Sequence, residues 1–193
     1  MTKTAMMNPD EILRHAENLL RQGNNKESKK NFHKYLSLYL PQHRNGVYCN
    51  LATIAMQESN VGLAIEHLKS SLETIPLWQA RMTLGDIYLN RTGQYALALE
   101  QFNLLIEENS HPSPALPYIK AADTLMMRRR YWDLDFPALP YLLKAVELEP
   151  KNSFIMDRTS FALFMAGRFE EAEKLQKRAI ELEETPEFLF NLA

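Results

Sequence analysis

The sequence predicts an all-α protein, a solenoid built from helix–turn–helix units. Two series of small residues recur along most of the chain at steps of 33 to 40 residues. Between them, apolar residues follow the i, i+4, i+7 spacing of one helical face. No segment shows sustained alternation of polar and β-branched apolar residues, so no strand is expected.

Each series marks one of the two helices of a unit, at the point where the helices must approach closely. The first series is Ala16, Ala52, Gly85, Ala122, Ser160 and Ala193. The second series is Ser28, Ala64, Ala98, Ala138 and Ala172, followed four positions later by Phe32, Leu68, Phe102, Leu142 and Gln176. Leu175 is expected to take the apolar role where Gln176 stands. Stacked neighbours would supply the core that a single unit lacks.

The two series divide the chain into units at about 9–41, 45–76, 78–110, 114–150 and 153–184. Residues 186–193 resemble the opening of the second unit, because the triplet Asn-Leu-Ala recurs in both. They are therefore expected to be the truncated first helix of a sixth unit. Since solenoids usually end in a polar cap, this apolar ending favours a native protein that continues beyond Ala193. The alternative is a native tail that folds back as a partial cap.

One unit carries a recognisable motif: Leu84-Gly85-Asp86-Ile87-Tyr88, then Gly93-Gln94-Tyr95-Ala96-Leu97-Ala98 and Phe102. This resembles the tetratricopeptide repeat (TPR), a helix–turn–helix of about 34 residues. The fifth unit is similar, with Ala166-Gly167-Arg168-Phe169-Glu170-Glu171-Ala172. The third unit has one extra residue before Gly93, and the fourth has about four extra around 131–136. The resemblance implies a single right-handed array over residues 1–193.

Composition and charge narrow the function classes. The 193 residues hold 22 Lys and Arg against 24 Asp and Glu, a balance that argues against bulk binding of nucleic acid. The single cysteine, Cys49, forms no internal disulfide, which fits a cytoplasmic location. No apolar stretch is long enough to insert in a membrane. Residues 1–45 are basic (8 against 4) and residues 144–193 acidic (7 against 10), which would favour head-to-tail self-association.

Residues that could do chemistry are scattered. The five histidines stand singly, no second cysteine is present, and no serine lies in a nucleophile-elbow sequence. We therefore expect no metal, no cofactor and no catalysis from this chain.

The TPR resemblance implies that the first helix of each unit lines a concave groove where partners bind. Matching the units gives these candidates: Arg14, Asn50, Met56, Met82, Asp86, Asn90, Lys120, Asp123, Met127, Arg158, Phe161, Phe164 and Met165. The later members are rich in Met and Phe, which suit adaptable apolar contact. The alternative is that several of them pack between neighbouring units.

A second candidate patch is Arg128, Arg129, Arg130 and Trp132, in the overlong part of the fourth unit. Arg and Trp dominate interface hot spots, so these residues would suit a partner-binding knob. The alternative is structural, because arginines at a helix C-terminus complement the helix dipole and the tryptophan would anchor the loop.

The sequence thus predicts a non-catalytic scaffold that binds a peptide or an amphipathic helix of a protein partner. The alternative is the N-terminal substrate-recruiting or oligomerising region of a larger enzyme, such as a glycosyltransferase, sulfotransferase or oxygenase. This second hypothesis rests on analogy between folds.

Overall fold

The computed structural model describes residues 8–38, 45–73, 77–128 and 136–183, and every regular element in these ranges is helical, as predicted. The chain divides into two compact units, Met1–Ile87 and Tyr88–Ala193, which are taken in turn below. A single array across the whole chain stays a prediction. None of the helices in the described ranges combines the length and the apolar character that a membrane span requires.

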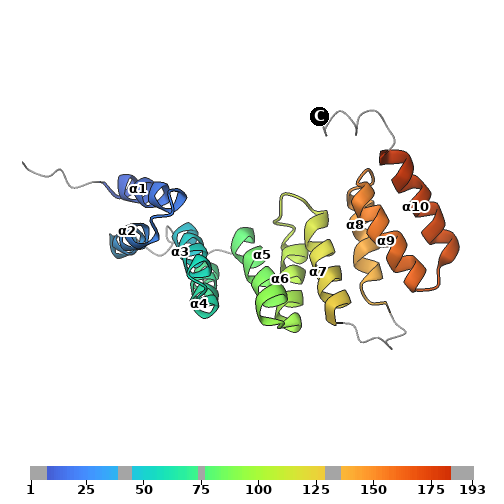
Figure 1. Cartoon of the computed structure of the whole chain (residues 1–193), viewed down its shortest axis with the longest axis horizontal. Coiled ribbons are helices and arrows are strands. Elements are labelled where there is room, and N and C mark those ends of the chain that lie inside the picture. The colour runs from blue at the N-terminus through green and yellow to red at the C-terminus, as the bar shows by residue number, and fades with distance from the viewer. Residues whose placement is uncertain (1–7, 39–44, 74–76, 129–135, 184–193) are drawn as a thin grey trace, which may run out of the picture. The chain divides into compact units, whose positions relative to one another are not determined.

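The first unit contains the helices α1 (Pro9–Arg21), α2 (Asn25–Leu38), α3 (Asn45–Gln57), α4 (Val61–Leu72) and α5 (Trp78–Ile87) (Figure 1). The second unit contains a π-helical turn, η2 (Tyr88–Thr92), and the helices α6 (Tyr95–Glu108), α7 (Ala115–Arg128), α8 (Leu139–Leu148), α9 (Ser153–Met165) and α10 (Phe169–Glu183) (Figure 1). Successive helices pack against one another within each unit, most extensively in the pairs α1/α2, α3/α4 and α9/α10.

The start of α1 shows how the sequence fixes a helix end. The Asn8 side chain accepts a hydrogen bond from the Glu11 backbone N–H, and the Glu11 carboxylate accepts one from the Asn8 N–H. Pro9 occupies the first turn, where a missing N–H costs nothing. This reciprocal capping box uses two of the backbone donors that a helix start otherwise leaves unpaired.

Both series of small residues lie in the core, which confirms the repeat period. Every described member is buried: Ala16, Ala52, Gly85, Ala122 and Ser160 in the first series, and Ser28, Ala64, Ala98, Ala138 and Ala172 in the second. The large residues four positions later are also buried: Phe32, Leu68, Phe102 and Leu142. In the fifth unit Leu175 packs against the apolar cluster around Ala172, as expected, while Gln176 is half-buried.

In four of the five repeats the first helix is followed by a residue with positive φ. In the fourth repeat the corresponding residues, 129–135, are not described. The residues with positive φ are Gly23, Ser59, Gly93 and Gly167, with φ of 75°, 59°, 63° and 75°. Such left-handed closures satisfy the carbonyls at a helix C-terminus and favour glycine, which has no Cβ. Ser59 is therefore the one strained member of this set.

The extra residue of the third unit is accommodated by the π-helical turn η2. In the first repeat the backbone hydrogen bond that closes the first helix runs five residues back, from the Asn24 N–H to the Leu19 carbonyl at 2.9 Å. In the third repeat it runs six back, from the Gln94 N–H to the Tyr88 carbonyl at 2.8 Å. A single-residue insertion widens one helical turn to the π form. The insertion is thus absorbed before the closing turn.

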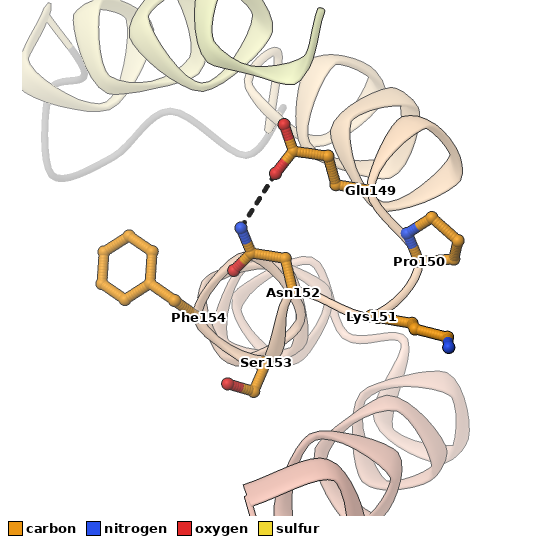
Figure 2. A pocket seen from close by; sticks show the side chains of 6 residues that line it. All are labelled: Glu149, Pro150, Lys151, Asn152, Ser153 and Phe154. Carbon is orange, nitrogen blue, oxygen red and sulfur yellow. Dashed lines mark hydrogen bonds between the residues drawn. The ribbon is translucent and has the colours of Figure 1, made fainter. Parts of the chain in front are cut away.

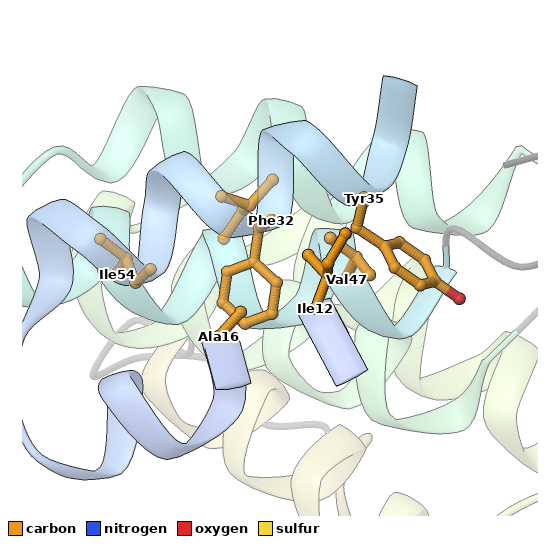
Figure 3. Close-up of a cluster of buried hydrophobic side chains, with 7 residues drawn as sticks. Ile12, Ala16, Phe32, Tyr35, Val47 and Ile54 are labelled. Atoms are coloured by element: carbon orange, nitrogen blue, oxygen red, sulfur yellow. The ribbon is translucent and has the colours of Figure 1, made fainter. Parts of the chain in front are cut away.

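The core of the first unit shows how a helix pair receives the next helix (Figure 3). Ile12 and Ala16 of α1 and Phe32 and Tyr35 of α2 form a surface on which α3 packs. From α3 come Val47, Leu51 and Ile54, and all seven side chains are at most 4% exposed. Figure 3 shows Val47 beside Ile12 and Tyr35. Val47, Leu51 and Ile54 are spaced i, i+4 and i+7, so they form the apolar face of α3.

Candidate protein-interaction surface

Helix α9 is apolar on two faces, and one of them is exposed. Its packed face carries Ile155, Met156, Thr159, Ala162 and Leu163, which are all buried. The other carries Phe154, Arg158, Phe161 and Met165, spaced i, i+4, i+7 and i+11, which we call the aromatic stripe. The three apolar members are 60%, 56% and 45% exposed. Exposed large apolar side chains gathered on one face mark an interaction site more often than isolated ones do.

Arg158 holds the centre of the aromatic stripe in place. Its guanidinium forms an ion pair with Asp123 of α7 and lies 5.4 Å from the centre of the Phe154 ring. Its Nε is buried without a hydrogen-bond partner, and burial lowers the pKa of the Arg158 guanidinium. The ion pair links α7 to α9, and so brings Lys120 and Met127, each about one turn from Asp123, to the same side as the aromatic stripe.

The turn between α8 and α9 positions Phe154 (Figure 2). The Asn152 side chain caps α9 by accepting from the Ile155 N–H at 3.2 Å, and its amide donates to Glu149 at 2.9 Å. The other Glu149 oxygen accepts from the Ser113 hydroxyl at 2.7 Å. Figure 2 shows Phe154 projecting to the opposite side of this turn from Lys151. The network thus fixes where α9 begins and hence where the aromatic stripe starts.

A second apolar surface lies between α9 and α10, and we call it the acceptor groove. Its volume is about 660 Å³, and its lining includes Asp157, Phe161, Phe164, Phe169, Glu173 and Gln176. The rings of Phe164 and Phe169 meet edge to face with centroids 5.3 Å apart. On the polar side the Gln176 amide donates to Asp157 at 2.9 Å, and its carbonyl contacts the Ser160 hydroxyl.

The predicted groove residues of the first unit differ in exposure. Arg14 is exposed, and its Nε donates to the Asp10 carbonyl at 3.4 Å. Asn50, Met56 and Asp86 are half-buried. Met82 is 8% exposed, so it belongs to the packed interior and offers no accessible surface.

The remaining predicted residues lie in the second unit or outside the described residues. Asn90 is exposed on η2, and Lys120 is half-buried on α7. Of the arginine patch, the backbone of Arg128 closes α7, but its side chain lies outside the description. Arg129, Arg130 and Trp132 lie outside the described residues, as does the predicted sixth-unit helix at 186–193.

Two aromatic residues of these surfaces were not among the predicted site residues. Phe154 lies four residues before Arg158 and seven before Phe161, so the same helical period identifies it. Phe169 follows Phe164 across the turn at Gly167, and only the folded geometry brings the two rings together.

The described residues contain no group of three or more His, Cys, Asp or Glu side chains placed to hold a metal ion. The Cys49 sulfur lies 3.4 Å from the Ser71 hydroxyl, and burial raises the pKa of its thiol. The protonated form is a weak nucleophile, so Cys49 behaves as a small packing residue.

Comparison with known proteins gives a fold. No protein-family model and no curated protein matches the sequence. MamA from Desulfovibrio magneticus RS-1 has a similar structure, with a TM-score of 0.71 at 17% identity over 94% of this chain and 99% of that one. A further structure titled simply MamA aligns with a TM-score of 0.68 at 18% identity over 88% and 94%. PilW, a widely conserved type IV pilus biogenesis factor, aligns at 0.63 with 14% identity over 94% and 80%.

MamA and PilW are TPR-type repeat proteins, and the described members of both small-residue series are buried in this chain. Identities below 20% carry information about fold alone. The chain therefore has the all-α helical-repeat fold of the TPR solenoids.

Proposed function

We propose that this protein is a non-catalytic scaffold that binds a peptide or an amphipathic helix of a protein partner through the aromatic stripe. The observation that carries the proposal is the exposure of Phe154, Phe161 and Met165 on a helix whose opposite face is fully packed. A solvent-facing helix of a globular protein is normally polar on its outer side. Exposed aromatic and Met side chains supply binding energy at interfaces.

The surroundings of the aromatic stripe support binding of a segment with mixed chemistry. The Asp123–Arg158 pair and Lys120 place charges beside the Phe and Met side chains. A partner would bury the apolar side chains and align its polar groups with these charges. The similar solved structures share the helical-repeat fold, and a fold of this kind offers an extended surface for binding.

The test compares partner capture by the native chain and by Phe154→Ser combined with Met165→Ser. Proteins cross-linked in lysate of the source cells are identified by mass spectrometry, and the partner is then titrated by calorimetry. We expect the double variant to raise the Kd at least about fivefold, equivalent to about 1 kcal/mol. Leu97→Ser with Leu148→Ser is the matched control, because it removes two exposed apolar side chains from other helices. Equal affinity of native chain and stripe variant contradicts the proposal.

The enzyme-arm alternative, self-association and the cytoplasmic location are separate proposals with separate tests. An immunoblot of source cells gives the mass of the native polypeptide, which is 22.4 kDa for this sequence alone. Analytical ultracentrifugation over a range of concentrations tests head-to-tail association, and cell fractionation tests the compartment.

A further inference from the structure

The first unit shows what covers a groove of the kind found between α9 and α10. There the pair α1/α2 is covered by the following helix, α3, whose Val47, Leu51 and Ile54 belong to one buried cluster with Phe32. These three residues are spaced i, i+4 and i+7, as expected of one face of an amphipathic helix.

The repeat register relates this arrangement to the acceptor groove. Ala16 corresponds to Ser160, and Ser28 to Ala172, so α9/α10 is the counterpart of α1/α2. At the position of the fully buried Phe32 stands Gln176, which is turned toward Ser160 and Asp157. The position of Tyr35 is taken by Ala179. Smaller or polar residues thus replace two large aromatic ones.

The consequence is a hollow walled by Phe161, Phe164 and Phe169. In the first unit Phe32, the counterpart of Gln176, is fully buried in the cluster that α3 completes. The apolar walls of the acceptor groove are exposed to water, and removing such surface from water is favourable.

Charge defines a fourth position on the incoming helix. In the first unit Lys29 of α2 lies 2.6 Å from the carboxylate of Glu58, the residue that follows α3. The counterpart of Lys29 is Glu173, an exposed carboxylate in contact with Lys177 one turn along its own helix. Because the groove carries an acidic residue where α2 carries a basic one, the incoming helix requires a basic residue at the position of Glu58. Asp157 adds a second carboxylate to the same groove.

We propose that the acceptor groove binds an amphipathic helix of a partner protein that carries apolar residues at i, i+4 and i+7, and Lys or Arg at i+11. This helix extends the repeat packing as α3 does on α1/α2. The acceptor groove and the aromatic stripe share Phe161 but are otherwise different surfaces, so each is tested without the other.

The probe is a fluorescein-labelled synthetic peptide of residues 45–58 carrying Cys49→Ser and Glu58→Lys. A matched peptide keeps Glu58. Fluorescence anisotropy with the full chain at low salt is expected to show at least about fivefold tighter binding of the lysine peptide. Glu173→Lys is expected to reverse that order. Phe164→Ser combined with Phe169→Ser is expected to weaken the lysine peptide at least about tenfold.

Controls separate this proposal from that for the aromatic stripe. Both exposed-residue double variants should keep the helical circular dichroism of the native chain, because neither touches the core. Phe154→Ser with Met165→Ser is expected to leave peptide binding within about twofold of the native value. Partner capture that survives in this variant contradicts only the proposal for the aromatic stripe, and peptide binding that survives in the Phe164→Ser and Phe169→Ser variant contradicts only the proposal for the acceptor groove.

Three results overturn the proposal. The first is equal affinity for the two peptides, or undiminished binding to the Phe164→Ser and Phe169→Ser variant. The second is binding at least tenfold tighter to a chain ending at Thr185, which assigns the groove to the chain's own residues 186–193. The third is a concentration-dependent dimer that is abolished by the same double variant, which assigns the groove to a second copy.

Discussion

The outer positions of α1 and α9 correspond in the repeat register, yet their chemistry is opposite. Where α9 presents the aromatic stripe, α1 presents Asp10, Arg14, Glu17 and Arg21. In α3 the same positions hold Gly46, Asn50, Thr53 and Gln57, and in α7 they hold Leu116, Lys120, Asp123 and Met127. The buried positions are alike in both units, so packing maintains the repeat while the outer positions are free to acquire a function.

The comparison predicts the largest stability difference between a buried and an exposed aromatic residue. Phe32→Ala removes a fully buried ring and is expected to cost about 3–5 kcal/mol of unfolding free energy. Phe154→Ala removes a 60% exposed ring and is expected to cost less than about 0.5 kcal/mol. Urea unfolding followed by circular dichroism measures both. Similar losses would mean that Phe154 serves packing, and the aromatic stripe would lose its functional interpretation.

A second contrast concerns one ion pair from each unit. Asp123→Ala leaves the half-buried Arg158 unpaired and is expected to cost about 1–3 kcal/mol. Glu58→Ala breaks the more exposed pair with Lys29 and is expected to cost less than about 1 kcal/mol. Combining Asp123→Ala with Arg158→Met should cost less than the sum of the two single changes, as a double-mutant cycle by urea unfolding would show.

A third contrast concerns the left-handed turns. Gly167→Ala places a Cβ at φ 75° and is expected to cost about 1 kcal/mol, although nothing lies within 4 Å of the new atom. Ser59→Gly relieves the same strain at φ 59° but increases the entropy of the unfolded chain, so a gain of at most about 0.5 kcal/mol is expected. Thermal unfolding should move in opposite directions for the two variants.

The smallest expected effect is a pH dependence in the first unit. His67 stacks on Tyr48, and burial together with the nearby His33 and Lys29 lowers its pKa below 6.5, while Glu66 opposes the shift. The unfolded chain therefore takes up the proton first as the pH falls. The contribution of His67 to stability is complete above pH 6.5 and is lost below it.

Unfolding measured between pH 8 and about pH 5 tests this, with His67→Gln expected to flatten the profile. A slope that persists unchanged in the variant would assign the pH dependence to another group.

Much of the fold follows from the sequence because the buried positions carry a strict period. Ala16, Ser28 and Phe32 lie where the period places them, and their counterparts repeat it. The reverse holds for α9, which has apolar residues all round. The spacing of apolar residues in α9 therefore does not distinguish the buried Met156 from the exposed Phe161. Choosing between these faces requires the neighbouring helices α8 and α10.

The sequence indicates the chemical character of the candidate surface but identifies only some of its residues. The enrichment of Met and Phe in the later units directs attention to α7 and α9, where the exposed apolar residues Met127, Phe154 and Phe161 lie. Met82 is nevertheless buried, while Phe154 is exposed without having been predicted. The acceptor groove could not be anticipated, because its lining comes from two helices and its walls include Phe164 and Phe169, which meet only across the turn at Gly167.

The π-helical turn at Tyr88–Thr92 has a consequence for how such a chain changes length during evolution. The added residue alters the hydrogen-bond span from five residues to six, while the left-handed closure at Gly93 is the same as at Gly23. A single inserted codon is thus tolerated without a redesigned loop, and a single deleted codon within the turn would restore the shorter spacing. Repeat lengths in this chain can therefore drift by one residue while the closing turns are conserved in form.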